Sequence, residues 1–264
     1  MVIFFEVNKK IKNGGLMKIA VCISHVPDTA TKIKIGQDEK KIDPAGVTYI
    51  INPYDEFAVE EALKTKEKFN CEVVALSVGG DNNKETIRKA LAMGVDKGVL
   101  LKDDNPRDSF AVAKALADEI KNQECDLVFM GKQSVDYDNS IVGQLTAEIL
   151  DYSCVTVVVD FKIENDKIVA EREIEGGKEV VETQLPAIIT AQKGLNEPRY
   201  ASLKGIMAAK KKVIEEKPAA SSENLTEVLK LKMPPTKQPG RILGTDSSAV
   251  PELVKLLREE AKIL

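Results

Sequence analysis

The sequence predicts an α/β protein whose mainly parallel sheet is flanked by helices. Two observations support this fold class. Short continuous apolar runs, which suit strands buried on both faces, alternate with helical segments from Met17 to Leu150. The connections between them carry Gly, Pro, Asn and Asp, which commonly end strands and begin helices. Such alternation favours parallel strands with helices on both faces.

Length and composition are those of an ordinary globular protein. A chain of 264 residues with 43% hydrophobic and 30% charged residues can form one large domain, or one domain with an extension. A net charge of −4 gives no drive towards nucleic acid or anionic membranes. We therefore expect no nucleic-acid partner. No apolar run is long enough to span a bilayer, so we expect a cytoplasmic protein with no membrane insertion.

The cysteines do not form a metal-binding or disulfide pattern. Cys22, Cys71, Cys125 and Cys154 stand far apart, and His25 is the only histidine. Most of these cysteines lie in or beside apolar runs, so buried thiols in a reducing compartment are expected. His25 has no visible nucleophile partner, which favours a loop histidine without a catalytic role.

The expected elements follow in order. Residues 1–16 form an N-terminal extension that lacks the charge order of a secretory signal. Pro53 suits the first turn of a helix that opens at Asn52, and Gly94 suits a helix C-cap. The remaining elements up to Leu150 are strands at 19–23, 72–78, 98–101 and 127–130, a hairpin-like segment at 33–42, and helices at 84–93 and 109–122.

The pattern changes after Leu150. Strand-like runs at 155–163, 167–174 and 179–184 are separated by turns, and 187–191 reads as a buried strand. Residues 17–216 are therefore assigned to one α/β domain with a β-rich segment. Residues 217–264 are assigned to an extended arm with a short strand at 228–231 and a helix at 250–263. A long segment with little core of its own is expected to pack on a partner subunit.

One stretch has the character of a phosphate site. A buried strand at 127–130 leads into a loop with Gly131, Asp136, Asn139 and Gly143, and a helix containing Leu145 follows. Backbone N–H groups just before a helix start attract phosphate, and ligands of open α/β sheets bind at this edge. An ordinary strand–helix loop with capping residues is the alternative.

A series of motifs resembles the β (small) subunits of electron transfer flavoproteins. The match covers essentially everything from Met17 to about Lys212, and the order of the motifs makes the resemblance specific. They are Val26-Pro-Asp-Thr, Asn52-Pro-Tyr-Asp-Glu-Phe-Ala-Val-Glu-Glu-Ala, Lys84-Glu-Thr-Ile-Arg-Lys-Ala-Leu-Ala-Met-Gly, Gly131-Lys-Gln-Ser-Val-Asp-Tyr-Asp, Val169-Ala-Glu-Arg-Glu-Ile-Glu-Gly-Gly, Leu185-Pro-Ala-Ile-Ile-Thr-Ala and Leu195-Asn-Glu-Pro-Arg-Tyr-Ala-Ser-Leu.

The resemblance implies an adenine nucleotide α-hydrolase-like fold without hydrolase activity. It implies a carrier subunit that binds AMP structurally and pairs with an alpha subunit holding the redox-active FAD. The heterodimer would take electrons from acyl-CoA or other flavin dehydrogenases, as in fatty acid β-oxidation, and pass them to a quinone-linked acceptor. No catalytic residue and no metal is expected in this chain.

The resemblance also assigns the nucleotide contacts. Asn52 offers both a donor and an acceptor to a purine edge. The assigned residues are Cys22, Asn52, Pro53, Tyr54, Asp55, Val78, Gly131, Lys132, Gln133, Ser134, Val135, Asp136, Tyr137, Asp138, Asn139, Ser140, Ile141 and Val142.

Departures from the family pattern leave two alternatives open. Ser140-Ile-Val replaces the Asn-Gln-Thr of many members, so Ser140 and backbone N–H groups must bind more of the phosphate. Pro27-Asp-Thr also occurs in bifurcating relatives, in which a second FAD replaces AMP and reacts with NADH. Tyr137 and Gln144 argue against that variant, and AMP is favoured. A stand-alone module of the universal-stress type is the other alternative, which the arm at 217–264 disfavours.

A second functional segment is expected near the end of the α/β domain. Gly194 to Leu203 resembles the loop through which the family docks to dehydrogenases by an anchoring leucine. Leu195 is expected to be that leucine, projecting from the surface with a polar rim around it. The assigned contacts are Leu195, Asn196, Glu197, Pro198, Arg199 and Tyr200.

Overall fold

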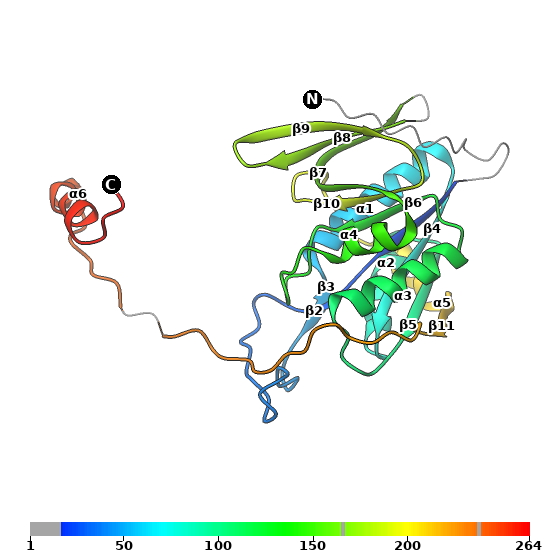
Figure 1. The fold of residues 1–264 in the computed structure, drawn as a ribbon, viewed down its shortest axis with the longest axis horizontal. Coiled ribbons are helices and arrows are strands. Elements are labelled where there is room, and N and C mark those ends of the chain that lie inside the picture. The colour runs from blue at the N-terminus through cyan, green and yellow to red at the C-terminus, as the bar shows by residue number, and fades with distance from the viewer. Residues whose placement is uncertain (1–16, 165–166, 237–238) are drawn as a thin grey trace.

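The computed structural model describes residues 17–164, 167–236 and 239–264, which form an α/β domain, an extended arm and a terminal helix (Figure 1). The predicted fold class is confirmed, whereas the expected extension at 1–16 lies outside the described residues. The strands are β1 (Lys18–Cys22), β2 (His25–Pro27), β3 (Tyr49–Ile51), β4 (Glu72–Gly79), β5 (Lys97–Lys102), β6 (Leu127–Gly131), β7 (Ser153–Glu164), β8 (Lys167–Ile174), β9 (Gly177–Thr183), β10 (Ala187–Ala191) and β11 (Ile214–Pro218). The helices are α1 (Pro53–Phe69), α2 (Asn83–Met93), α3 (Ser109–Asn122), α4 (Val142–Leu150), α5 (Leu203–Lys211) and α6 (Val250–Glu259), with a 3-10 turn η1 (Ser247–Ala249).

The main sheet has the strand order β11-β5-β4-β1-β6-β10-β7-β8-β9. Neighbours from β11 to β7 are parallel, and β8 and β9 continue the sheet in antiparallel pairing. The strand β1 lies centrally, between β4 and β6. The carboxyl ends of β1, β4 and β6 therefore meet at one edge, where ligands of open α/β sheets bind.

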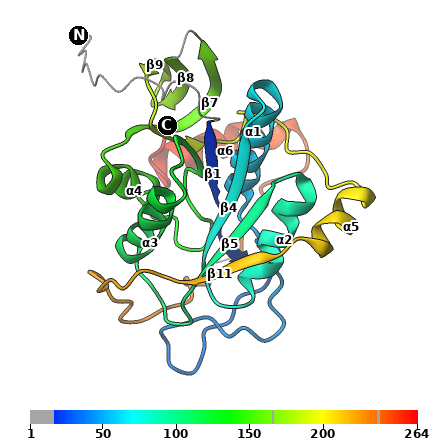
Figure 2. The same cartoon turned by 90° about the vertical axis from the view of Figure 1, so that its right-hand side faces the viewer.

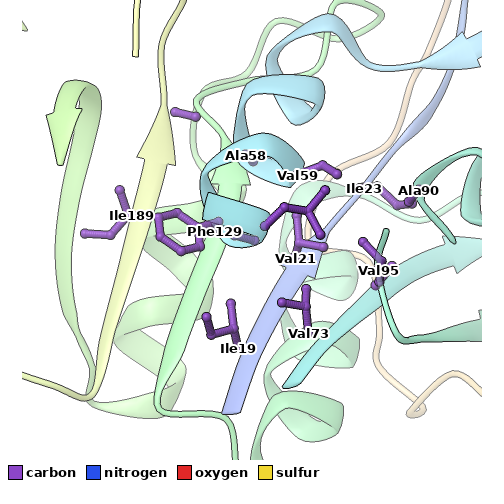
Figure 3. Packing of buried hydrophobic residues seen from close by; sticks show 14 of the residues in the cluster. Ile19, Val21, Ile23, Ala58, Val59, Val73, Ala90, Val95, Phe129 and Ile189 are labelled. Carbon is purple, nitrogen blue, oxygen red and sulfur yellow. The ribbon is translucent and has the colours of Figure 1, made fainter. Parts of the chain in front are cut away.

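Each face of the sheet is covered by its own pair of helices. Figure 2 shows α1 and α2 on one side of the central strands and α3 and α4 on the other. Ile19 and Val21 belong to the core beneath α1 and α2, whereas Ala20 belongs to the core beneath α3. In Figure 3, Val21 and Phe129 lie beneath the α1 residues Ala58 and Val59. This alternation is what strands buried on both faces require.

The loop between β2 and β3 contains the expected hairpin-like segment at 33–42 in a short form. Ile35 and Ile42 form an antiparallel bridge, flanked by backbone hydrogen bonds between the two arms. The charged run from Asp38 to Lys41 forms the tight turn between them, in which the Asp38 carboxylate accepts from the N–H groups of Lys40 and Lys41. Side-chain hydrogen bonds of this kind compete with strand pairing, in agreement with a single bridge.

The C-terminal part differs from the prediction. The strand β11 was not anticipated, and it extends the sheet past the expected domain boundary at 216. Its exposed Glu215 and Glu216 suit an edge strand, but because of them the sequence has no apolar run that would predict a strand here. The expected strand at 228–231 is wrong, because Leu231 donates its N–H to the Glu39 carbonyl in the β2–β3 loop at 2.6 Å instead of pairing within a ladder.

The terminal helix lies apart from the α/β domain. Figure 1 shows α6 at the far end of the arm, and none of its residues is buried. It ends at Glu259, earlier than the expected residue 263. None of the helices in the described part of the chain has the length and apolar character needed to cross a membrane.

Candidate functional site

A buried carboxylate holds the candidate nucleotide site together. Asp55 lies in the first turn of α1, and its Oδ2 accepts from the Ser24 N–H after β1 at 2.7 Å. Its Oδ1 accepts from the Gly131 N–H at the end of β6 at 2.9 Å. One side chain therefore joins a helix start to the ends of two neighbouring strands. The sequence resemblance marked Asp55 as a nucleotide contact and did not reveal this role.

Burial determines the protonation of Asp55. Loss of solvation raises the pKa of its carboxyl to about 7, although the hydrogen bonds that it accepts lower it. The group consequently titrates near neutral pH.

Asn52 fixes the path of the loop that follows β6. Its side chain is fully buried, its Nδ2 donates to the Gln133 carbonyl at 2.8 Å, and its Oδ1 accepts from the Val135 N–H at 3.2 Å. Both amide atoms are thus engaged by the backbone, and the side chain has no exposed edge for a purine in this structure. The assignment of Asn52 as a nucleotide contact stays a prediction.

The loop between β6 and α4 bends sharply just before the helix. Asp138 and Ser140 both have φ of 54°, a left-handed conformation that is uncommon outside glycine. Ser140 Oγ donates to Gln133 Oε1 at 2.8 Å, and Gln133 donates to the Asp138 carboxylate. The Asn139 amide donates to Ser109 Oγ at 3.0 Å, which ties the loop to the start of α3.

The N-terminus of α4 suits an anion. The N-cap residue of α4 is Ile141, whose side chain makes no capping hydrogen bond, and the first turn contains no acidic residue. Helix N-terminal N–H groups without a capping side chain attract negative charge. Gly143 lets this turn approach β10 closely, since a Cβ there would lie 2.6 Å from Thr190 Cγ2.

The other assigned residues surround this edge. Cys22 and Val78 lie near the ends of β1 and β4, and Gly131 ends β6. Gly131 passes so close to α1 that a Cβ would lie 2.9 Å from the Tyr54 carbonyl carbon. Lys132 lies over the Tyr54 ring at 5.0 Å from its centroid. The remaining loop residues, from Ser134 to Tyr137, are half-buried or exposed.

His25 lies in β2 rather than in a loop. Its ring stacks on Tyr49 with 4.6 Å between centroids, and its Nδ1 lies 2.7 Å from Thr86 Oγ1. Burial lowers the pKa of this imidazole. The contacts with Tyr49 and Thr86 account for the position of His25. Within the described ranges, no three His, Cys, Asp or Glu side chains form a metal-binding group.

The expected docking segment has a different leucine at its surface. Leu195 is only 9% exposed and belongs to the core beneath α1, so the expectation that it projects is wrong. Burial of the Leu195 side chain among apolar core residues is therefore favoured even though its neighbours in the sequence are polar. Tyr200 and Leu203 are 98% and 78% exposed, and the first turns of α5 add the exposed Ile206 and Met207.

Two polar residues fix this segment to α1. Arg199 donates through Nε and Nη2 to the buried Glu60 carboxylate at 2.8 and 3.0 Å, and it also pairs with Glu67. Asn196 donates to the Phe57 carbonyl and to Glu61 Oε2 at 3.0 and 2.9 Å. These contacts position the exposed Tyr200 and Leu203 relative to the domain.

Comparison with known proteins agrees with this architecture. A family model for the electron transfer flavoprotein domain matches residues 40–222. The electron transfer flavoprotein subunit beta of Bacillus subtilis is 39% identical over 94% of this chain and 100% of its own length. Those of Syntrophomonas wolfei and Homo sapiens are 42% and 39% identical, over 85% and 94% of this chain and 88% and 99% of their own lengths. The chain therefore belongs to the electron transfer flavoprotein family, among its beta subunits.

Proposed function

We propose that the chain is the small subunit of a heterodimeric electron transfer flavoprotein and that it binds AMP structurally. The observation that carries the nucleotide assignment is the sharply bent loop at 131–142, which leads into the α4 N-terminus without a side-chain cap. FAD held by the alpha subunit would supply the redox chemistry. This chain would contribute a nucleotide-stabilised scaffold and docking surfaces.

The residues at the α4 N-terminus fit an adenylate phosphate. Backbone N–H groups of the first turn would hold it, since phosphate matches both the N–H donors and the helix dipole. The Ser140 hydroxyl would join them by turning its O–H from Gln133 Oε1 to the phosphate. Asn52 and Asp55 act indirectly, because their polar atoms already bind the backbone at Gln133, Val135 and Gly131.

The arm supports the proposal of a partner subunit. Leu225, Leu229 and Ile242 are exposed along it, and an open groove of about 530 Å³ follows where the arm meets α6. The groove is lined by Arg241, Leu243, Leu253, Leu256, Leu257, Glu260 and Ala261. Apolar side chains gathered on an extended segment are typical of an interaction surface. An alpha subunit that covers the arm and α6 would bury them.

Ser140→Asp is expected to lower AMP affinity by about tenfold or more. A carboxylate beside the α4 N-terminus would compete for the same N–H groups and repel phosphate. The apo protein should lose the hydrogen bond from Ser140 to Gln133, an effect offset because acidic groups favour helix N-termini and aspartate tolerates the left-handed backbone of Ser140. AMP released from the purified heterodimer and the shift of Tm with added AMP would measure the effect.

The neutral variant Ser140→Asn serves as the control and should retain AMP. Equal AMP affinity in both variants would place the phosphate elsewhere. Identification of the released nucleotide also separates the alternatives. A second FAD in this chain would indicate the bifurcating type, and a nucleotide-loaded chain that binds no alpha subunit would indicate a stand-alone module.

Leu203→Ala is expected to raise the apparent KM of an acyl-CoA dehydrogenase for the heterodimer by about tenfold, or ~1.4 kcal/mol of docking free energy. The docking segment offers this leucine, 78% exposed, beside the exposed Tyr200. Such an apolar centre on a fixed surface segment suits a transient partner. Steady-state kinetics with the assembled heterodimer as the variable substrate would measure the change.

Val180→Ala is the matched control, because Val180 is also exposed, at 65%, but lies on β9, outside the docking segment and the arm. It should leave this KM unchanged. If both variants raise KM equally, or neither does, Leu203 does not anchor the dehydrogenase.

A further inference from the structure

One carboxylate at the start of α3 makes several of the hydrogen bonds that attach the arm to the α/β domain. Asp108 is the N-cap of α3, and its Oδ1 accepts from the Ala111 N–H at 2.8 Å. Its Oδ2 faces the arm and accepts from the N–H groups of Leu225 and Thr226 at 2.6 and 2.8 Å and from Thr226 Oγ1 at 3.2 Å. The same side chain thus caps a helix and binds a segment more than a hundred residues later in the chain.

Neighbouring residues extend this attachment. Asn224 Nδ2 donates to the Pro106 carbonyl, and Asn224 Oδ1 accepts from the Asp108 N–H, both at 3.0 Å. Arg107, which pairs with Asp103 at 2.8 Å, donates to the Ala220 carbonyl at 2.9 Å. In Figure 1 the arm crosses the domain here before it leaves towards α6. Residues 106–108 therefore bind the arm between residues 220 and 226.

The remaining contacts join the arm to the β2–β3 loop, where the Leu231 N–H donates to the Glu39 carbonyl at 2.6 Å. Lys40 pairs with Glu227 at 2.6 Å, and Glu39 pairs with Lys230 at 2.7 Å. Exposed ion pairs contribute little, whereas hydrogen bonds to a charged carboxylate are among the stronger ones. Burial raises the pKa of Asp108, but hydrogen bonds from Ala111, Thr226 and Leu225 outweigh it and bring the pKa below its ordinary value. Asp108 is therefore charged at neutral pH and is the principal attachment.

We infer that Asp108 is a positioning residue for subunit assembly. By fixing the arm at Leu225 and Thr226, it orders the segment that presents the exposed Leu225 and Leu229 before the alpha subunit binds. A segment ordered in advance loses less conformational entropy on association. This inference rests on the proposed function, because it takes the alpha subunit as the occupant of the arm.

Asp108→Asn removes one of the two oxygens by which Asp108 serves the cap and the arm. An amide has one oxygen, so asparagine can serve either the α3 cap or the arm, and asparagine is a good N-cap residue. Asn224→Ala weakens the same attachment without altering α3. Asp118→Asn is the matched control, because it makes the same change at a half-buried position on α3 that pairs with Lys114.

Two measurements test the inference. Hydrogen exchange in the full chain should show about tenfold faster exchange of the Leu225 and Thr226 amides in Asp108→Asn, with unchanged exchange in the interior of α3. The Kd for heterodimer dissociation, measured by dilution of the assembled protein, should rise about tenfold or more in Asp108→Asn and Asn224→Ala. Asp118→Asn should change neither, and AMP content should stay normal because the Asn139–Ser109 hydrogen bond is intact.

The outcomes are distinguishable. Unchanged amide exchange in Asp108→Asn would show that the carboxylate does not hold the arm. Faster exchange with an unchanged Kd would show that the attachment has no part in assembly. Either result overturns the inference while leaving the proposed function intact. Failure of the wild-type chain to form any heterodimer would overturn the proposed function and this role with it.

Discussion

Asp55→Asn is expected to flatten the dependence of stability on pH between about pH 4 and pH 7. The pKa of Asp55 is raised from 3.8 to about 7 in the folded protein because the carboxyl is buried. In this range the folded state keeps a proton that the unfolded state has released, so the free energy of unfolding falls as pH rises. The contribution is fully present below about pH 4 and is lost by about pH 7, at most ~4 kcal/mol for a shift of this size.

Asparagine cannot titrate, so its variant should lack this component. Chemical denaturation at a series of pH values and a fixed nucleotide concentration would show it. Asp246→Asn is the control. A hydrogen bond from Ser248 lowers the pKa of that exposed carboxyl, so its titration changes the free energy of unfolding only at pH values below about 4. The same slope in wild type and Asp55→Asn would mean that another buried group titrates in this range.

Arg199→Ala is expected to lower the free energy of unfolding by about 2–3 kcal/mol and to impair dehydrogenase docking at once. Glu60 has a side chain only 8% exposed, and without the guanidinium it would be a buried carboxylate that lacks its charged partner. Breaking buried pairs costs about 3–5 kcal/mol, and the partial exposure of Arg199 reduces that figure. Denaturation midpoints and the dehydrogenase KM would measure both effects.

Two further variants separate geometry from charge. Arg199→Lys should recover only part of the stability, because an ammonium cannot donate the paired hydrogen bonds that Glu60 accepts. Arg241→Ala breaks the exposed pair with Glu260 and should cost about 1 kcal/mol or less. Equal losses for Arg199→Ala and Arg241→Ala would mean that Glu60 does not depend on its partner.

Local sequence signals were sufficient for most of the α/β domain. The helix at 109–122 and the strands at 167–174 and 187–191 occur with the expected bounds, because apolar periodicity and turn residues agree there. α1 begins at Pro53 as expected, because the fixed φ of proline suits the first turn of a helix. β11 escaped notice because an edge strand with glutamates lacks an apolar run, and its stability depends on pairing with β5.

The candidate site was predictable in place but not in detail. The strand–loop–helix pattern identified the loop at 131–142, and the resemblance added the residues around it. The roles of Asn52 and Asp55 depend on long-range hydrogen bonds that no local pattern encodes. Leu195 was misjudged for a similar reason. Its polar neighbours indicated exposure, but Arg199 and Asn196 attach the segment to α1 and leave Leu195 in the core.

The position of β10 has a consequence for how the chain folds. It lies between β6 and β7, yet it follows both in the chain. Until β10 enters, β6 is an open edge, and β7 with its antiparallel neighbours has no parallel strand to join. The sheet thus becomes continuous only through a contact between distant parts of the chain, which is a slow step in folding. Because Gly143 packs on Thr190 of β10, the loop at 131–142 takes its final support from the same contact.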